Sequence, residues 1–191
     1  LLTFGIRLNA INYDLIKCDQ YTIEDGLPQS SIETIYQDEN GYLWIATQDG
    51  ISKFNGYEFN NYFFDPYNIK SLGSNYVLEI KKWNKDTICF TTPLGVSLLP
   101  IKSTEFHNYG LTNLIPEMEL VHSSAILGNG NVLLGTKGGL YLARLDDTLT
   151  TNDVQLIDEK MQPTQLHNFK EAVLFTNGNS FYKYKSGKVQ L

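Results

Sequence analysis

The sequence has few of the features that mark disulfide-rich, membrane-spanning or nucleic-acid-binding proteins. Two cysteines, Cys18 and Cys89, occur in 191 residues, too few for a disulfide framework. No apolar run reaches the roughly 18 residues expected of a membrane-spanning helix. Lys and Arg number 15 against 21 Asp and Glu, for a net charge of -6. This acidic balance predicts no basic surface that could replace the counterions of a nucleic acid.

Motifs for catalysis are also missing. The sequence contains no Gly-x-Ser-x-Gly elbow, phosphate-binding loop or Cys-x-x-Cys pair. His107, His122 and His167 are too far apart in sequence to form a local metal-ligand pair. The acidic residues mostly fall in expected turns: Glu24, Asp25, Asp38, Glu39, Asp49, Asp146 and Asp147. We therefore predict no catalytic residue, no metal and no cofactor in this chain.

Aromatic residues, in contrast, are abundant. The chain has 12 Tyr, 10 Phe and 2 Trp, with 42% hydrophobic and 19% charged residues overall. This composition can bury a core, which argues against global disorder. Aromatic side chains pack well on a pleated surface, so their excess favours β structure.

A repeated pattern organises the chain. An apolar run is followed by Thr, two variable residues, Gly and another apolar residue. The threonines are Thr47, Thr92 and Thr136, spaced 45 and 44 residues apart. A degenerate fourth copy contains Thr176, another 40 residues on. A fixed period of this length is typical of proteins built from stacked structural repeats.

Other segments keep nearly the same spacing. Residues 27–32 match residues 72–77 at an offset of 45, and residues 58–62 match 105–109 at an offset of 47. The tripeptide Val-Gln-Leu occurs at 154–156 and again at 189–191. Several independent matches at similar offsets indicate true internal repetition.

Each repeat has the pattern of short strands joined by tight turns. In the first repeat we expect strands at 31–36, 42–47, 51–54 and 57–62, separated by turns at 39–41, 49–50 and 55–56. The Asn-Gly and Asp-Gly pairs in these turns supply the positive φ that tight hairpins require. No stretch of ten residues has helical periodicity. Four short strands per repeat predict an all-β protein, a β-propeller of four-stranded antiparallel blades.

The repeat period also predicts blade boundaries. We expect blade 1 at 21–62, blade 2 at 63–109, blade 3 at 110–157 and a partial blade 4 at 158–191. Residues 1–20 are expected to be a leader remnant or a first strand. Since propellers usually close with 4–8 blades, about 3.5–4 blades predict an incomplete arc of a larger ring.

Two segments of the first blade carry a resemblance to a known family. Residues 38–51 read Asp-Glu-Asn-Gly-Tyr-Leu-Trp-Ile-Ala-Thr-Gln-Asp-Gly-Ile, and residues 21–32 read Tyr-Thr-Ile-Glu-Asp-Gly-Leu-Pro-Gln-Ser-Ser-Ile. Together they resemble the two-component-regulator propeller repeat, found in the N-terminal sensor region of hybrid two-component histidine kinases of the Bacteroidetes type. The family pattern is filled by Asp38, Gly41, Leu43, Trp44, Ile45, Thr47, Gly50, Ile51 and Phe54.

The resemblance implies a sensor on the periplasmic side of the bacterial inner membrane. It implies an oligosaccharide ligand, a seven-bladed ring completed by further blades of the same chain, and a homodimer in the full-length receptor. Binding would be passed on by conformational change. The membrane helix and kinase core of such a receptor would lie outside this segment, so the segment itself is expected to be neither an enzyme nor a binder of nucleic acid.

Two sets of residues follow from this register. The structural set maintains turns and blade packing: Asp38, Gly41, Trp44, Thr47, Gly50, Thr92, Gly95, Thr136 and Gly139. We expect Trp44 to wedge between blades and Thr47 to bond nearby backbone or a side chain of the next blade. The candidate ligand set lies in the loops between second and third strands and between blades: Ser30, Ser31, Gln48, Asp49, Ser74, Asn75 and Lys137.

Alternatives remain open at this stage. The chain could be a polysaccharide-cleaving or carbohydrate-binding propeller unrelated to signalling, or a scaffold segment without ligand contacts. The Asp-box of sialidase-like propellers also ends in Gly-x-x-Trp, but Asp38 lies three residues before Gly41 where that box has two. Cys18 and Cys89 could pair in an oxidising compartment, or Cys89 could be a buried strand residue.

Overall fold

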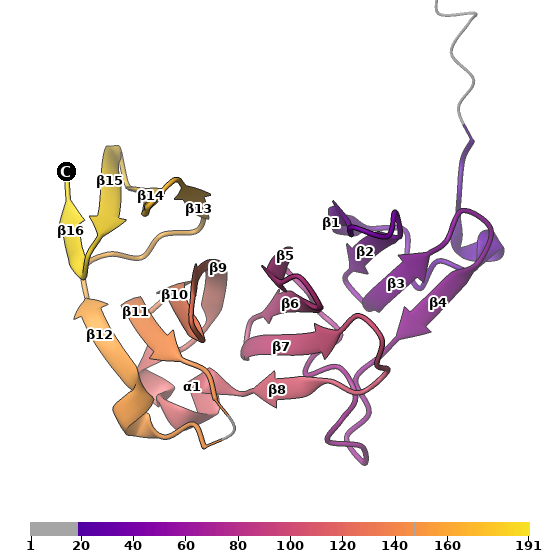
Figure 1. The fold of residues 1–191 in the computed structure, drawn as a ribbon, viewed down its shortest axis with the longest axis horizontal. Coiled ribbons are helices and arrows are strands. Elements are labelled where there is room, and N and C mark those ends of the chain that lie inside the picture. Colours follow the sequence, from indigo (N-terminus) through magenta and orange to yellow (C-terminus); the bar gives the residue numbers. More distant parts are fainter. Residues whose placement is uncertain (1–18, 147) are drawn as a thin grey trace, which may run out of the picture.

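A computed structural model describes residues 19–146 and 148–191. These residues form four antiparallel sheets of four strands each, with only short helical turns between them. The sheets follow one another around an arc, with blade 1 at one end and blade 4 at the other (Figure 1). The expectation of an all-β incomplete propeller is confirmed.

Each blade is a four-stranded meander in chain order. Blade 1 follows the 3-10 turn η2 (Ile23–Asp25) and contains β1 (Ile32–Gln37), β2 (Leu43–Thr47), β3 (Gly50–Phe54) and β4 (Phe59–Tyr62). Blade 2 contains β5 (Glu79–Asn84), β6 (Thr87–Thr92), β7 (Gly95–Pro100) and β8 (His107–Tyr109). The strands of blade 1 lie within about a residue or two of the expected ranges.

Blades 3 and 4 repeat the arrangement. After α1 (Leu111–Leu114) and η3 (Pro116–Met118), blade 3 contains β9 (Val121–Gly128), β10 (Asn131–Thr136), β11 (Gly139–Arg144) and, after η4 (Thr151–Asp153), β12 (Val154–Asp158). Blade 4 contains β13 (Leu166–Phe169), β14 (Ala172–Asn177), β15 (Ser180–Lys185) and β16 (Lys188–Gln190). Blade 4 therefore has four strands, where the sequence suggested only part of a blade.

The first strand of each blade lies on the inner side of the arc. Strand β5 contacts β1 on one side and β9 on the other, and β9 contacts β13. The turns joining second to third strands emerge at one end of the blades, and the turns joining first to second and third to fourth strands emerge at the opposite end. These two ends form the two faces of the arc, named below the 2–3 face and the 1–2 face.

The Thr-x-x-Gly repeat forms the turns of the 2–3 face. The Thr47 hydroxyl donates to the Gly50 carbonyl at 2.9 Å, and Thr136 donates equivalently to Gly139 at 2.8 Å. The hydroxyl of Thr47 also accepts from the Asp49 amide at 3.1 Å. We expected Thr47 to bond either to nearby backbone or to a side chain of the next blade. The structure shows bonds to backbone within the same turn. The Thr47 hydrogen bond therefore closes the turn between β2 and β3. Because Thr47 is fully buried, water does not compete for this bond.

The turn glycine is required by a close approach of the outermost strand. A Cβ added at Gly95 would lie 2.0 Å from the Tyr109 carbonyl oxygen, and one at Gly139 would lie 2.9 Å from that of Asp158. Both residues also have positive φ, at 147° and 139°. The repeated glycine thus permits β8 and β12 to pass beside the 2–3 turns.

In blade 4 the strand pairing differs by one residue from the pairing that the sequence repeat predicts. In blades 1 to 3 the repeat threonine pairs with the turn glycine, as Thr47 with Gly50. The equivalent pair in blade 4 is Asn177 with Ser180, so Thr176 lies one residue out of register and is exposed. The prediction of Thr176 as the fourth repeat threonine was wrong. Asn177 occupies that place, and its side chain bonds outside the turn, accepting from Gln162 N and donating to Lys160 O in the segment that enters blade 4.

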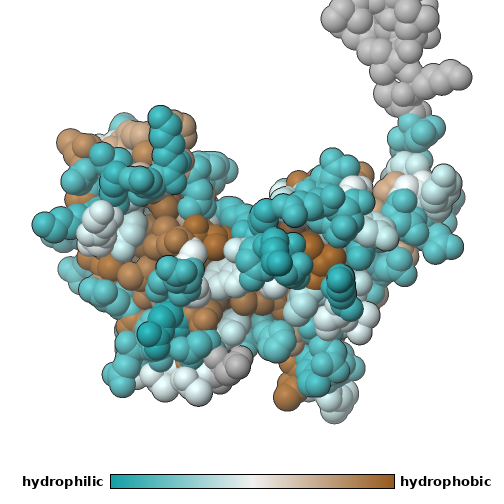
Figure 2. All heavy atoms as spheres, viewed as in Figure 1, coloured by the Kyte–Doolittle hydropathy of each residue, from teal (hydrophilic) through white to brown (hydrophobic). Residues whose placement is uncertain are grey.

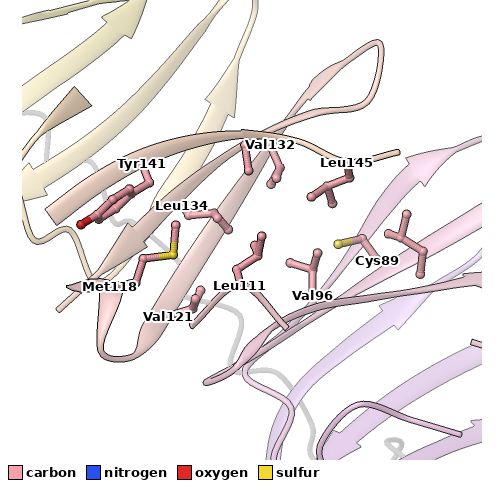
Figure 3. Packing of buried hydrophobic residues seen from close by; sticks show 11 residues of the cluster. Cys89, Val96, Leu111, Met118, Val121, Val132, Leu134, Tyr141 and Leu145 are labelled. Carbon is pink, nitrogen blue, oxygen red and sulfur yellow. The ribbon is translucent and has the colours of Figure 1, made fainter. Parts of the chain in front are cut away.

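Three hydrophobic clusters fill the spaces between successive blades. Between blades 1 and 2, Trp44 is fully buried and its ring meets Phe90 of β6 and Tyr62 of β4, with centroids 5.7 and 5.8 Å away. The predicted wedge role of Trp44 is confirmed. A second cluster joins blades 2 and 3, where Cys89 and Val96 face Leu111, Val132 and Leu134 (Figure 3). The third joins blade 3 to Phe175 and its neighbours in blade 4.

Some expectations fall outside or at the edge of the described residues. The proposed leader or first strand lies almost wholly in residues 1–18, which the description does not cover, and so does Cys18. Cys89 is a buried free thiol, as one of the two interpretations expected. No helix in residues 19–146 or 148–191 combines the length and apolar character needed to cross a membrane.

Candidate functional site

The family motif around Asp38 is a structural unit. Asp38 is 5% exposed and accepts from three donors with its two carboxylate oxygens. Oδ1 accepts from the amides of Asn40 and Tyr42 at 2.9 and 3.1 Å, and Oδ2 accepts from Trp44 Nε1 at 3.0 Å. One carboxylate therefore shapes the β1–β2 turn and fixes the orientation of the inter-blade tryptophan. This arrangement explains why the motif joins an acidic residue, a turn and a Trp.

The seven candidate ligand residues follow the 2–3 face. Gln48, Asp49 and Lys137 lie in 2–3 turns, while the other four lie in the segments that enter β1 and β5: Ser30, Ser31, Ser74 and Asn75. The structure brings two of them together, because Asn75 Nδ2 donates to Asp49 Oδ1 at 2.8 Å across the junction of blades 1 and 2. Lys137, in blade 3, is not joined to them and pairs with Glu119 instead.

Most of these side chains are engaged within the protein. Gln48 Nε2 donates to Glu33 at 2.9 Å, and Asn75 Oδ1 also accepts from the Phe64 amide at 2.6 Å. The Ser74 hydroxyl accepts from the Tyr76 amide at 3.3 Å, and the Ser31 amide donates to Gln29. Their internal contacts are those of loop organisation, and a ligand role for them stays a prediction.

A pair of asparagines on the outermost strands was not predicted from the sequence. Asn61 Nδ2 of β4 donates to the Gly26 carbonyl at 2.8 Å, and Asn108 Nδ2 of β8 donates to the Ser71 carbonyl at 2.7 Å. Each asparagine holds the segment that enters its blade. The matching sequences at 58–62 and 105–109 contained this signal, because Asn61 and Asn108 occupy the same place in both.

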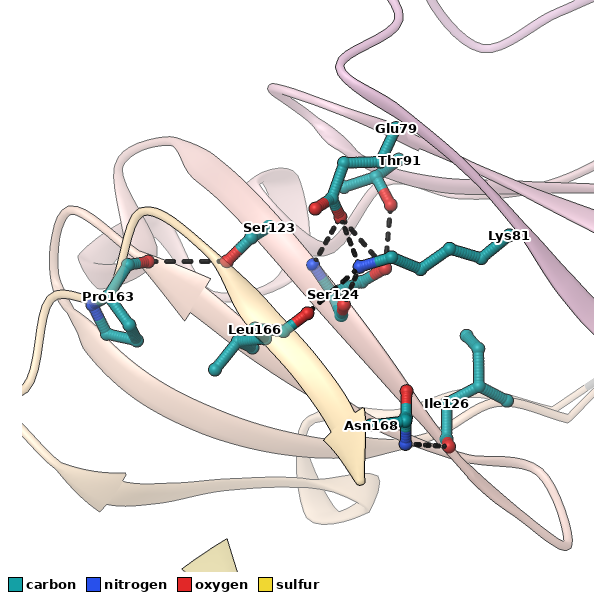
Figure 4. Close-up of polar contacts among 9 residues, drawn as sticks. All are labelled: Glu79, Lys81, Thr91, Ser123, Ser124, Ile126, Pro163, Leu166 and Asn168. Atoms are coloured by element: carbon teal, nitrogen blue, oxygen red, sulfur yellow. Dashed lines mark hydrogen bonds and ion pairs between the residues drawn. The ribbon is translucent and has the colours of Figure 1, made fainter. Parts of the chain in front are cut away.

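A polar network connects the inner strands of three blades (Figure 4). Lys81 Nζ of β5 binds Glu79 Oε2 at 2.8 Å, the Leu166 carbonyl of β13 at 3.3 Å, and the Ser124 carbonyl of β9. Glu79 Oε2 also accepts from the Ser124 amide at 2.9 Å. The Ser124 and Thr91 hydroxyls are 2.7 Å apart. A single ammonium group of blade 2 thus reaches the backbone of blades 3 and 4.

Beside this network, two cavities open toward the 1–2 face. The first, of about 570 Å³, is lined by Tyr36, Ile80, Lys81, Lys82, Trp83, Ile126, Leu127, Gly128 and Asn168, from all four inner strands. The second, of about 380 Å³, lies between blades 3 and 4 and shares Ile126, Leu127 and Asn168 with the first. The two cavities form one groove, named here the inner groove, within the size range of ordinary ligand sites.

The second cavity ends at turns of blade 4. Its remaining lining is Asn131, Leu142, Lys170, Glu171, Ala172, Tyr184, Lys185, Ser186 and Gly187. Asn168 Nδ2 donates to the Ile126 carbonyl at 2.8 Å, which closes blade 4 against blade 3 where the cavities meet. In space-filling view, apolar atoms gather around the middle of the arc and the outline is notched between blades 4 and 1 (Figure 2). This groove is not apparent in the sequence, since its lining comes from strands about 45 residues apart.

Ion pairing and burial shift the pKa of several groups in and near the groove. A hydrogen bond to Glu39 raises the pKa of Lys82, so that this exposed ammonium stays charged. Burial raises the pKa of the Tyr36 and Tyr184 hydroxyls, which therefore remain neutral hydrogen-bonding groups at neutral pH. Burial likewise raises the pKa of the Cys89 thiol to about 12, and this thiol is no candidate nucleophile.

The described part of the chain offers no metal-binding cluster of three or more His, Cys, Asp or Glu side chains. Glu79, the most enclosed acid beside the groove, is committed to Lys81 and to the Ser124 amide. The lining of the inner groove includes aromatic, amide and ammonium groups.

Comparison with known proteins supports the resemblance carried by blade 1. Residues 26–49 match the sequence model of the two component regulator propeller. The chain is 40% identical over 68 residues to histidine kinase P4 of Formosa agariphila, a match that covers 36% of this chain and 5% of that protein. The resemblance to the two-component-regulator propeller repeat is confirmed.

Solved structures with the same fold include extracellular and surface proteins. The extracellular domain of the putative hybrid two component system BT4673 from B. thetaiotaomicron has a TM-score of 0.62 at 17% identity, over 84% of this chain and 21% of that one. PorZ, a surface component of the type-IX secretion system of Porphyromonas gingivalis, has a TM-score of 0.66 at 15% identity, over 90% and 23%. The chain spans 21% and 23% of the lengths of these two proteins. It spans 31% of the extracellular domain of a third, the putative hybrid two component system BT3049 from B. thetaiotaomicron. At these identities the likeness concerns the fold alone.

Proposed function

We propose that this chain is part of the extracytoplasmic sensor of a two-component histidine kinase and that the sensor recognises an oligosaccharide. The observation that carries the proposal is the regulator propeller motif of blade 1. The Asp38–Trp44 unit lies within residues 26–49, which match the regulator propeller repeat, and the chain is 40% identical over 68 residues to a histidine kinase.

The structure supports a binding role over a catalytic one. The inner groove combines aromatic side chains, from Tyr36 and Trp83, with the amides of Asn131 and Asn168. Flat rings stack on the apolar faces of sugar rings, and amides can both donate to and accept from hydroxyl groups. The two acids nearest the groove are both held in ion pairs, Glu79 with Lys81 and the lining residue Glu171 with Lys185, which argues against a pair of free catalytic carboxylates.

Signalling would use the coupling between blades. Lys81 ties β5 to β9 and β13, so a ligand bound along these strands can change the relative placement of blades 2, 3 and 4. Transmission to a kinase would require that the bound and free placements differ in their affinity for the ligand. On this proposal the receptor is a homodimer whose sensor lies on the periplasmic side of the inner membrane.

Calorimetric titration of the chain with a panel of plant, algal and host oligosaccharides tests the proposal. We expect heat of binding for at least one saccharide and no new reducing ends after prolonged incubation. Release of reducing ends would overturn the sensor assignment in favour of a polysaccharide-cleaving propeller. Absence of binding across the panel, by both this chain and the full-length receptor, would exclude oligosaccharide recognition.

A further inference from the structure

The inner groove has a charge opposite to that of the whole chain. Its lining contains four lysines, Lys81, Lys82, Lys170 and Lys185, and one acid, Glu171. The complete chain carries a net charge of -6. A cationic lining on an acidic protein concentrates the local potential in the groove and attracts anions there.

The four lysines differ in how firmly they are held. Lys81 is committed to the inner-strand network with Glu79 and two carbonyls. Lys82 pairs with Glu39, and Lys185 pairs with Glu171, but all four of these side chains are 44% exposed or more. Exposed ion pairs contribute little stability, so an incoming anion can compete for either ammonium.

Lys170 is the ammonium with the fewest commitments. Among the described residues it forms no ion pair with a carboxylate, and its Nζ lies over the Phe169 ring at 5.5 Å from the centroid. It is positioned in the β13–β14 turn at φ 53°. Its place in the lining puts an available positive charge at the blade 4 end of the groove, with Lys82 at the blade 2 end.

We propose that the inner groove binds an acidic oligosaccharide, one that carries carboxylate or sulfate groups along its length. The proposal rests on the proposed function and names the ligand class and the place. Sugar rings lie against Trp83 and Tyr36, the amide oxygens of Asn131 and Asn168 accept from hydroxyls, and Lys82 and Lys170 bind the anionic groups. The groove lies on the 1–2 face, opposite to the 2–3 face on which the sequence placed the candidate ligand residues.

The experiment is calorimetric titration of the chain with three tetrasaccharides: tetragalacturonic acid, a chondroitin sulfate tetrasaccharide and neutral maltotetraose. We expect one or both acidic probes to bind and maltotetraose to bind at least tenfold more weakly. Binding should weaken as salt rises from about 50 mM to about 500 mM, because salt screens exposed charges. The two acidic probes distinguish carboxylate from sulfate as the recognised group.

Substitutions locate the site. Lys170→Asn removes the charge and retains a residue type that tolerates positive φ, so the fold should be preserved. We expect it to weaken binding of the acidic probe roughly three- to tenfold. Lys160→Asn, at an exposed lysine outside the groove, is the matched control and should leave affinity unchanged. Thermal unfolding of each variant verifies that the fold is intact.

Four outcomes would overturn the inference. Equal affinity for maltotetraose excludes charge recognition, and equal affinity for tetraglutamate excludes recognition of the sugar. Loss of affinity in Lys137→Asn but not in Lys170→Asn places the site on the 2–3 face. No binding of either acidic probe excludes this ligand class, while binding of neutral saccharides in the wider panel would leave the proposed function standing.

Discussion

At the scale of single residues, the Asp38 carboxylate joins a turn to the inter-blade tryptophan. Its carboxylate is 5% exposed and serves three donors, two in the turn and one on Trp44. A buried carboxylate is tolerated only where hydrogen bonds replace its lost hydration. The turn geometry and the tryptophan orientation consequently depend on the same side chain.

We predict that Asp38→Asn lowers the free energy of unfolding by about 1–3 kcal/mol. The amide can retain the turn bonds through one oxygen, but its nitrogen cannot accept from the indole N–H of Trp44. Urea unfolding followed by fluorescence measures the loss.

Trp44→Phe provides the partner for a double-mutant cycle. Because the phenyl ring has no donor, Asp38→Asn should cost less in the Trp44→Phe background than in the wild type. Additive losses would show that the Asp38–Trp44 bond is not the source of the effect.

At the scale of elements, the 2–3 turns decide how close the outermost strand lies. A Cβ at Gly95 would meet the Tyr109 carbonyl at 2.0 Å, whereas one at Gly41 meets nothing within 4 Å. Both glycines have positive φ, at 147° and 87°. The pair therefore separates backbone strain, which both positions share, from steric collision, which only Gly95 has.

We predict that Gly95→Ala lowers the free energy of unfolding by at least about 3 kcal/mol or prevents folding altogether. Gly41→Ala, the matched control, should cost only about 1–2 kcal/mol from its left-handed backbone. Solubility and thermal unfolding of the two variants give the comparison. Equal losses would mean that β8 can move away from the turn at little cost.

At the scale of the whole molecule, the arc leaves apolar side chains on both end blades. In blade 1, Ile35 is 59% exposed and pairs across the sheet with Ile45, while the neighbouring pair of Tyr36 and Trp44 packs on the opposite face, toward blade 2. In blade 4, Phe181 is 59% exposed beside Leu174 and Phe175. Sheet faces of this kind associate with other sheets when no further blade covers them.

We predict that the chain in isolation associates as its concentration rises, and that Ile35→Lys combined with Phe181→Lys suppresses the association. Sedimentation velocity over a concentration series measures it. Tyr57→Lys is the matched control, because Tyr57 is 92% exposed in a β3–β4 turn and not on a blade face. A wild-type chain that stays monomeric at all concentrations would contradict this expectation.

Much of the fold could be predicted from sequence because its determinants are local. Tight turns require Gly or Asn at given positions, and the Thr-x-x-Gly pattern closes one hairpin within four residues. Blade 4 marks the limit of this reasoning. There Asn177 occupies the place of the threonine but bonds to Lys160 and Gln162 of the segment before β13, and the sequence pattern points to Thr176 one residue away.

The candidate site could be predicted only in part. The sequence identified loops of the 2–3 face, and the structure joins Asp49 to Asn75 there. It gave no sign of the inner groove, whose lining residues Tyr36, Trp83, Ile126 and Asn168 lie at intervals of roughly 45 residues on four different strands. Such residues carry no shared motif, since each contributes a different side chain to one common space.

The sequence by itself determined the repeat, the strands and the place of Trp44, because each depends on residues near one another in the chain. Only the tertiary structure decided which side chains meet on the inner side of the arc. Lys81 reaches backbone atoms 43 and 85 residues away, and Lys82 and Lys170 come to line one groove from separate blades. The reason is physical: hydrophobic packing between blades sets their angle, and that angle gathers distant charges around a common cavity.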